Sequence, residues 1–151
     1  MLAAAPDAAP AAPAGPQWVV FSCDDVRLAA PLERVREILT PSPFTRLPGC
    51  GPEVCGLIAV RGRVVTVFDL GLLIGRRSSA AVPDHRLLLV ERDGRAVGFA
   101  VDAVVTIAHA FTEPATDVTL PIADEVSGIG TIEEGSFIAL DPERLLGRLL
   151  L

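Results

Sequence analysis

The chain has 151 residues, half of them hydrophobic, and a formal net charge of −6. Its 13 cationic residues are all arginine, so neither a phosphate-loop lysine nor a Schiff-base lysine is available. The acidic balance argues against nucleic acid as a partner, because binding a phosphate backbone requires clustered positive charge. No apolar run reaches the roughly 18 residues of a membrane helix, so membrane insertion is not expected.

Residues 1–16, MLAAAPDAAPAAPAGP, are rich in alanine and proline and have no basic start. This composition fits neither a signal peptide nor a transit peptide, and it predicts a disordered leader. Residues 17–151 are then expected to form one folded domain. Cys23, Cys50 and Cys55 are odd in number and lack a secretory context, which predicts reduced thiols in the cytoplasm.

The first folded elements are expected to be strands at 17–23 and 26–32, separated by a turn at Asp24-Asp25. The segment 32–39, LERVREIL, then places Leu32, Val35 and Leu39 at helical spacing. This spacing predicts a helix of about two turns, which Pro41 ends.

Two hairpins are expected next. Residues 54–60 and 63–69 flank Gly62, which can adopt a positive φ in a tight turn. Residues 86–92 and 95–102 flank Asp93-Gly94, a dipeptide typical of hairpin turns. A strand at 104–110, strands at 126–134 and 136–141, and a helix from 142 to the C-terminus complete the predicted order.

The segments VVTVFDLGLLIGR and FIALDPERLLGR resemble each other. Asp69 and Asp141 are predicted helix N-caps, and Pro142 suits the first helical position. Gly75 and Gly147 are predicted to end the two helices. The likeness indicates a duplicated fold plan, although strands followed by an Asp-capped helix are common enough for coincidence to remain the alternative.

Catalytic chemistry is not expected. His85 and His109 lie in or beside predicted strands without a nucleophile motif, so we interpret them as surface or half-buried histidines. The spacing of Cys50 and Cys55 is wider than that of a metal knuckle, and no second pair completes a zinc site. The alternative hypothesis is a small enzyme or ligand sensor that uses Cys50, Cys55 and His85 around a pocket.

Two arginines flank the glycine of the first predicted hairpin. Arg63 is interpreted as a solvated hairpin end, since exposure is usual for arginine. Arg61 can reach the segment VREI, where Glu37 is the natural partner for a bidentate ion pair. Such a pair would fix two loops and present a defined charged surface.

Four segments resemble, in order and spacing, the CheW-like domain of bacterial chemotaxis coupling proteins. They are VREI (35–38), GLIAVRGRVVTVFDL (56–70), VGFAVDAV (97–104) and SGIGTIEEGSFIALDPERLL (127–146). The resemblance implies a mostly β fold of two SH3-like five-stranded β-barrel subdomains around a shared core, with short connecting helices and a C-terminal helix. It also implies no catalytic activity, no cofactor and no metal.

The resemblance further implies the partners, namely the regulatory domain of a CheA-type histidine kinase and the cytoplasmic tips of methyl-accepting chemoreceptors. The residues that match family positions contacting partners, or holding that surface together, are Val35, Glu37, Ile38, Gly56, Arg61, Gly98, Asp102 and Ile107. Ala59 stands where the family usually has asparagine, which removes one side-chain hydrogen bond. A coupling module of a divergent chemosensory pathway, such as gliding motility, is the alternative within the family.

Overall fold

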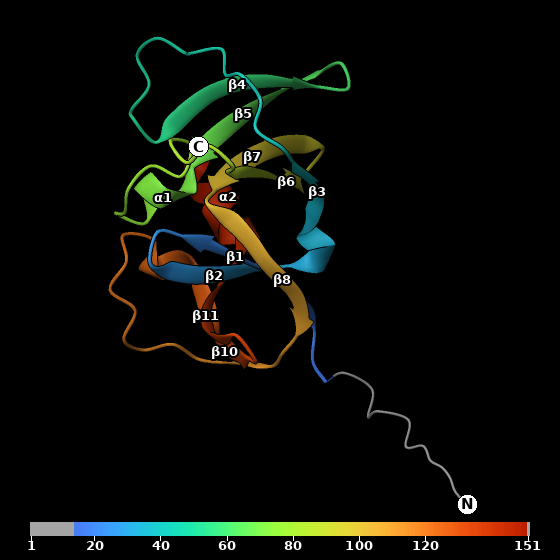
Figure 1. Cartoon of the computed structure of the whole chain (residues 1–151), viewed down its shortest axis with the longest axis vertical. Coiled ribbons are helices and arrows are strands. Elements are labelled where there is room, and N and C mark those ends of the chain that lie inside the picture. Colours follow the sequence, from blue (N-terminus) through green and yellow to red (C-terminus); the bar gives the residue numbers. More distant parts are fainter. Residues whose placement is uncertain (1–13, 151) are drawn as a thin grey trace, which may run out of the picture.

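The structure, a computed structural model, describes residues 14–150, so most of the predicted leader lies outside the described residues. The described chain folds into two β-sheets stacked one above the other (Figure 1). The six-stranded sheet has the order β8-β1-β2-β11-β10-β9, and the five-stranded sheet has the order β3-β6-β7-β5-β4. In this part of the chain no helix is long and apolar enough to cross a membrane.

The strands are β1 (Gln17–Cys23), β2 (Val26–Pro31), β3 (Val35–Leu39), β4 (Val54–Val60), β5 (Arg63–Asp69), β6 (Arg86–Arg92), β7 (Arg95–Val101), β8 (Ala103–His109), β9 (Thr112–Glu113), β10 (Val126–Ile132) and β11 (Gly135–Leu140). The helical elements are the α-helices α1 (Leu70–Leu73) and α2 (Pro142–Leu149) and the 3-10 turns η1 (Leu32–Arg34) and η2 (Ala123–Glu125). The mostly β fold predicted from the sequence is confirmed.

The predicted hairpins are confirmed, and their turns have the expected chemistry. Arg61 and Gly62 have φ values of 48° and 78°, and Asp93 and Gly94 have values of 50° and 77°. Two successive residues with positive φ are typical of the turns whose twist matches a two-stranded hairpin. Glycine adopts this conformation at little cost, but arginine does not, so the conformation of Arg61 is unusual.

The predicted helix over 32–39 is wrong. Only Leu32–Arg34 forms a 3-10 turn, and Val35–Leu39 is the edge strand β3, in which Val35 lies opposite Val90 of β6 and Ile38 opposite Leu88. A two-turn helix has little stability of its own, whereas β-branched residues pack well on a pleated sheet. The free edge of β6 therefore determines the conformation of this segment.

The duplication indicated by the sequence reappears in the topology. Asp69, the last residue of β5, donates its backbone N–H to the Glu53 carbonyl at 2.7 Å, and Asp141, directly after β11, donates to the Glu125 carbonyl at 2.8 Å. Each of these strands has a parallel neighbour, β7 for β5 and β2 for β11. Each aspartate caps the helix that follows it, as predicted: Asp69 caps α1 and Asp141 caps α2. Pro142 occupies the first turn of α2.

One of the two predicted helix ends is confirmed and the other is wrong. Gly75 has a φ of 77° directly after α1, as expected of a helix-ending glycine. Gly147 lies inside α2, so the prediction that it ends the helix is wrong.

The larger sheet has six strands instead of five because β9 pairs with Ile129 and Gly130. The corresponding contact in the other sheet is a single bridge between Thr45 and Leu57.

One hydrophobic core joins the two sheets. It contains Phe21 from the six-stranded sheet together with Phe68 and Phe99 from the five-stranded sheet, and Leu145 and Leu146 of α2 pack into it. The rings of Phe68 and Phe99 lie 6.1 Å apart. Burying large apolar side chains from both sheets in one cluster stabilises them as a unit, so the shared core expected from the resemblance is confirmed.

Candidate partner-binding surface

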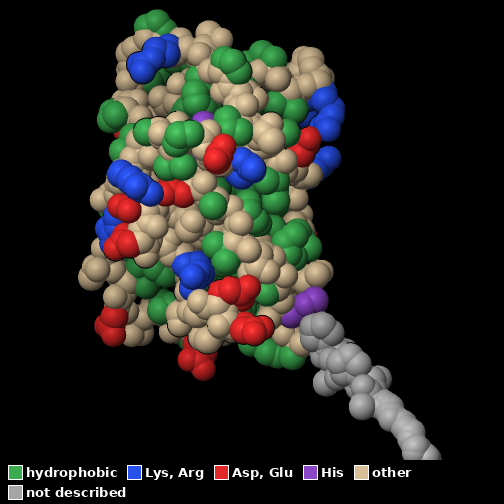
Figure 2. Space-filling view, viewed as in Figure 1, with side chains coloured by type: hydrophobic (Ala, Val, Ile, Leu, Met, Phe, Trp, Pro, Cys, Tyr) green, Lys and Arg blue, Asp and Glu red, His purple; other side chains and the backbone are tan. Residues whose placement is uncertain are grey.

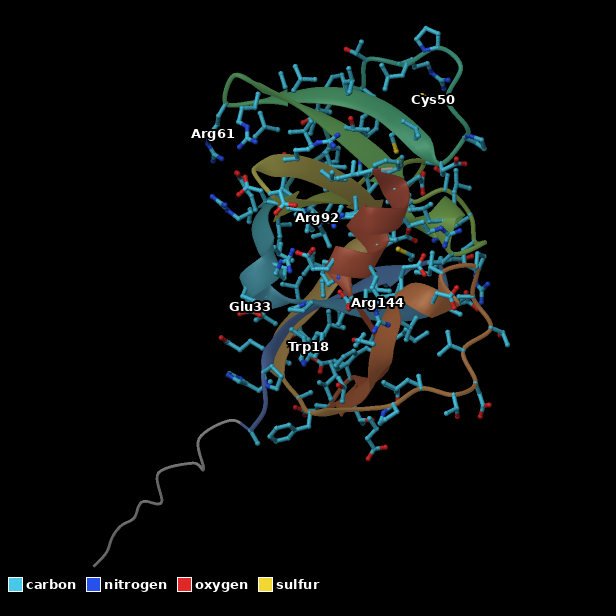
Figure 3. All side chains as sticks on the ribbon, turned by 180° about the vertical axis from the view of Figure 1, so that it is seen from behind. Trp18, Glu33, Cys50, Arg61, Arg92 and Arg144 are labelled. Carbon is cyan, nitrogen blue, oxygen red and sulfur yellow. The ribbon has the colours of Figure 1, made fainter. Side chains whose placement is uncertain are left out.

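The predicted ion pair between Arg61 and Glu37 is confirmed. Nη1 of Arg61 donates to Oε1 of Glu37, and Nη2 donates to Oε2 at 2.8 Å. Arg61 projects from the tip of the β4–β5 hairpin, as Figure 3 shows, whereas Glu37 lies on β3. Since β3 and β4 are the two edges of the five-stranded sheet, the pair holds these edges close together.

The ion pair has a defined electrostatic effect. The hydrogen bond from Arg61 lowers the pKa of the Glu37 carboxyl below its usual value, and the pair raises the pKa of the Arg61 guanidinium. The Arg61 side chain remains 74% exposed. Its positive φ of 48° is a conformation that costs on the order of 1 kcal/mol for a residue of this type. The pair therefore holds an exposed guanidinium in a defined position at the hairpin tip.

Two apolar candidates accompany Glu37 on β3. Val35 is half-buried and packs against the shared core, whereas Ile38 is exposed over 38% of its surface. The structure therefore brings Glu37 into contact with Arg61, while Val35 and Ile38 lie near Glu37 along β3. Of the two apolar residues, Ile38 is the one that presents a large exposed surface.

Gly56 and Gly98 lie inside the sheet and not on its surface. A Cβ atom on Gly56 would lie 2.4 Å from the Thr45 carbonyl oxygen, and the φ of Gly56 is 137°. A Cβ atom on Gly98 would lie 3.0 Å from Cγ2 of Val67. Contacts this short cannot accommodate a side chain without movement, so both glycines contribute to the surface by permitting the packing beneath it.

Asp102 lies at the crossover from β7 to β8, where it joins three segments. Its Oδ2 accepts hydrogen bonds from the Asp24 amide at 3.0 Å and from Nη2 of Arg77 at 2.9 Å. Its own amide donates to the Ser22 carbonyl at 2.8 Å. Burial raises the pKa of Asp102, but the neighbouring Ser79 hydroxyl, the Arg77 guanidinium and the Asp24 amide outweigh it and hold the pKa below its usual value.

Asp102→Asn is expected to destabilise the fold at neutral pH by about 1 to 2 kcal/mol, because the charge-assisted bonds to a buried carboxylate are lost. A depressed carboxyl pKa gives stability that is present above the unfolded value of about 4 and is lost as the pH falls through the folded value. The difference between the wild type and the variant should therefore shrink below about pH 4. Urea denaturation at several pH values measures it, and a difference independent of pH would contradict this account.

Ile107 belongs to a separate surface. It lies on β8, the edge strand of the six-stranded sheet, and is 50% exposed. Val105 points the same way and is 36% exposed, and Phe111, just beyond the strand, is 70% exposed. Figure 2 shows hydrophobic side chains gathered on the face that β8 crosses in Figure 1. The predicted site residues with exposed side chains thus fall into two surfaces, one around Arg61 and one along β8, whereas Gly56, Gly98 and Asp102 are buried.

Sequence reasoning missed several members of both surfaces. The strict alternation of Val105, Ile107 and His109 along β8 could have identified an outward-facing stripe. Arg63 was interpreted as a solvated hairpin end, but it donates to the Gly94 carbonyl at 2.8 Å and pairs with Glu91 at 3.3 Å. These contacts depend on how separate hairpins approach each other, for which the sequence contains no local signal.

A cavity of about 450 Å³ lies beside Cys50 and Cys55, but it lacks one of the three residues that the enzyme alternative requires. Cys50, Cys55 and Asp69 line it, whereas His85 is not among its lining residues. Burial raises the pKa of the Cys55 thiol to about 12, so it is not a thiolate at neutral pH. Within residues 14–150 no three His, Cys, Asp or Glu side chains are placed to hold a metal ion.

Asp69, which also lines this cavity, has a structural role. Asp69 is 1% exposed, and its carboxylate accepts hydrogen bonds from the Leu72, Ser79 and Ala80 amides and from the Ser78 hydroxyl. Its oxygens are therefore occupied in holding the segment that follows α1. His85 is buried, so its predicted surface or half-buried position is wrong: Nδ1 contacts the Val82 carbonyl at 2.7 Å, and the buried Nε2 has no hydrogen-bond partner among the described residues.

A charged pair at a hairpin tip and an exposed apolar stripe on an edge strand together define a protein-interaction module with two packed β-sheets. The family model of the CheW-like domain matches residues 17–149. The chain therefore belongs to the CheW-like domain family.

Comparisons with individual proteins agree with this assignment. The chain is 27% identical over 107 residues to the chemotaxis protein CheW of Rhizobium meliloti (strain 1021), which covers 69% of each chain. It is 30% identical over 119 residues to protein FrzA of Myxococcus xanthus, which covers 78% of this chain and 72% of FrzA. The crystal structure of the scaffolding protein TtCheW from Thermoanaerobacter tengcongensis superposes with a TM-score of 0.76 at 27% identity, over 87% of each chain.

Proposed function

We propose that this protein is a non-catalytic chemotaxis adaptor that couples methyl-accepting chemoreceptors to a CheA-type histidine kinase. It acts in the cytoplasm, where receptor arrays recruit it from solution. Val35, Glu37, Ile38 and Arg61 contribute one binding surface, and Ile107 contributes the other. Gly56, Gly98 and Asp102 hold these surfaces in place.

The observation that supports this proposal is that two separate exposed features lie on one shared core. The ion pair of Arg61 and Glu37 lies at the end of the five-stranded sheet, and the exposed side chains of Val105 and Ile107 lie on the edge of the other sheet. A protein that bridges two partners needs two such surfaces. Membership of the CheW-like family and the fold of a scaffolding protein support the same conclusion.

Binding of the purified chain to each partner tests this proposal. The kinase regulatory domain and a receptor cytoplasmic fragment from the same organism are immobilised separately, and the chain is passed over each. We expect the chain to bind both, and the kinase and receptor to be retained together only when the chain is present. Binding to neither partner would contradict the proposed function.

A second candidate lies within the same family, namely a coupling module of a divergent chemosensory pathway such as gliding motility. The 30% identity to FrzA of Myxococcus xanthus supports this second candidate. The binding experiment separates the two candidates when kinases from different chemosensory systems of the same organism are compared. The kinase bound most tightly identifies the pathway.

A further inference from the structure

Two cysteines lie on either side of a tight turn in the loop between β3 and β4. The Gly51 carbonyl accepts a hydrogen bond from the Val54 amide at 3.1 Å, which closes this turn. Pro52 occupies its second position, where the fixed φ of proline favours a turn. Cys50 directly precedes the turn and Cys55 directly follows it, so the two cysteines stand on its two arms.

The two arms run antiparallel, and both cysteines face the same space. Thr45 and Leu57 form an antiparallel bridge further along the arms, with two reciprocal backbone hydrogen bonds of 2.8 Å. Opposed residues of antiparallel arms have Cα atoms roughly 4.5 to 5.5 Å apart, and a disulfide requires about 4.4 to 6.8 Å. Cys50 and Cys55 both line the cavity of about 450 Å³. This placement suits a disulfide between them.

The three thiols of the chain differ in their access to solvent. Cys50 is exposed, Cys55 is half-buried, and Cys23 is buried in the shared core. Figure 3 shows Cys50 on the outer loop of the five-stranded sheet. Burial raises the pKa of both the Cys23 and the Cys55 thiol to about 12. Exposure therefore makes Cys50 the thiol that a dissolved oxidant meets first.

We propose that Cys50 and Cys55 are a modification site at which a peroxide forms a reversible disulfide. Sγ of Cys50 attacks one peroxide oxygen and the O–O bond breaks. The other oxygen leaves with the thiol proton, as water or an alcohol, and Cys50 becomes a sulfenic acid. Sγ of Cys55 then attacks the Cys50 sulfur, the S–O bond breaks, and the oxygen leaves with the Cys55 proton as water. Each sulfur loses one electron and the peroxide gains two.

The same geometry makes the disulfide slow to reverse. An external thiolate reaches the exposed sulfur of Cys50 and must expel Cys55 from it. A thiolate whose pKa is raised to about 12 is a poor leaving group. The disulfide therefore outlasts the peroxide that formed it, and without a peroxide both residues remain thiols. This inference goes beyond the adaptor function and does not depend on it.

Hydrogen peroxide added to the full folded chain tests the proposal, followed by alkylation of free thiols in denaturant, trypsin digestion and mass spectrometry. Cleavage after Arg46 and Arg61 releases peptide 47–61, which contains Cys50 and Cys55, whereas Cys23 lies in peptide 1–27. We expect peptide 47–61 to lose the mass of two hydrogen atoms and to resist alkylation. Cys23 should react about tenfold more slowly than Cys50, because it is buried.

Three serine variants separate the steps. In Cys55→Ser the sulfenic acid on Cys50 has no partner, so dimedone should capture it. In Cys50→Ser the remaining thiol at Cys55 should stay open to alkylation. Cys23→Ser is the matched control and should form the disulfide as the wild type does.

Three outcomes overturn the proposal. They are two free thiols in peptide 47–61 after treatment, a Cys50 that is linked to a second chain or overoxidised without the internal disulfide, and equal reaction of Cys50 and Cys23. No kinase or receptor takes part in this experiment, so each of these results leaves the proposed function standing. A failure of the binding experiment likewise leaves the cysteine chemistry unaffected.

Discussion

Replacing Arg61 with glutamate is expected to abolish assembly of the chain with kinase and receptor while leaving the fold intact. The substitution places two carboxylates together where Arg61 and Glu37 now pair. Breaking an exposed ion pair costs little stability compared with the roughly 5 to 15 kcal/mol that keeps a domain folded. A reversed charge on a docking surface opposes association directly, so binding should suffer far more than folding.

The double variant Arg61→Glu/Glu37→Arg is the control for this prediction. It restores an ion pair across the same two elements, β3 and the β4–β5 turn, so it should recover part of the binding if the pair organises the surface. Pull-down at fixed salt measures assembly, and circular dichroism with thermal melts measures folding. Full assembly by Arg61→Glu would contradict the role given to the pair. Unfolding of that variant would assign Arg61 a structural role only.

Replacing Asp69 with alanine is expected to cause a large loss of stability. The carboxylate of Asp69 is 1% exposed and accepts hydrogen bonds from three amides and one hydroxyl. Its removal leaves these donors without their acceptor, and a bond to a charged group is worth about 1.5 to 3 kcal/mol. We expect a total loss of about 3 to 5 kcal/mol, which lowers the melting temperature by roughly 10 °C for a domain of this size.

Asp141 provides the matched comparison, because it occupies the corresponding position after β11. Its side chain accepts hydrogen bonds from the amides of Glu143 and Arg144, as an N-cap, and pairs with Nε of Arg144 at 3.4 Å. Asp141→Ala should therefore cost about 1 kcal/mol. Chemical denaturation of the two variants side by side measures the difference. Equal losses would show that Asp69 is only a helix cap and does not hold the segment at 78–80.

The sequence predicted the elements whose signals are local. Asp93-Gly94 and Gly62 identified two hairpins because tight turns require residues that accept positive φ, and Asp69 and Asp141 identified two helix starts. The pairing of Arg61 with Glu37 was also predicted, since Arg61 follows the strand GLIAV and Glu37 is the carboxylate in the segment VREI.

The features that the sequence did not predict depend on tertiary contacts. The strand β3 has apolar residues at helical spacing, and only the edge of β6 makes it extended. The register between these strands shifts after Val35, which opposes Val90, so that Glu37 opposes Leu89. Such a bulge redirects a side chain without a sequence signal, and the contact of Arg36 with Glu91 could therefore not be predicted.

The division of the site residues between two surfaces was unpredictable for the same reason. Ile38 and Ile107 both occupy apolar strands, but β3 and β8 are edges of different sheets. The exposure of Arg63 was expected, whereas its contacts with Glu91 and Gly94 follow from the approach of two hairpin tips. Long-range packing determines these positions.

The most direct test of the adaptor function is the autophosphorylation rate of the CheA-type kinase in the presence of receptor-containing membranes, with and without this chain. If the protein couples receptor to kinase, adding it should raise the kinase rate and make that rate respond to the receptor's ligand, and Arg61→Glu should do neither. A kinase rate that is unchanged by the wild-type chain, with both partners shown to be active, would contradict the proposed function.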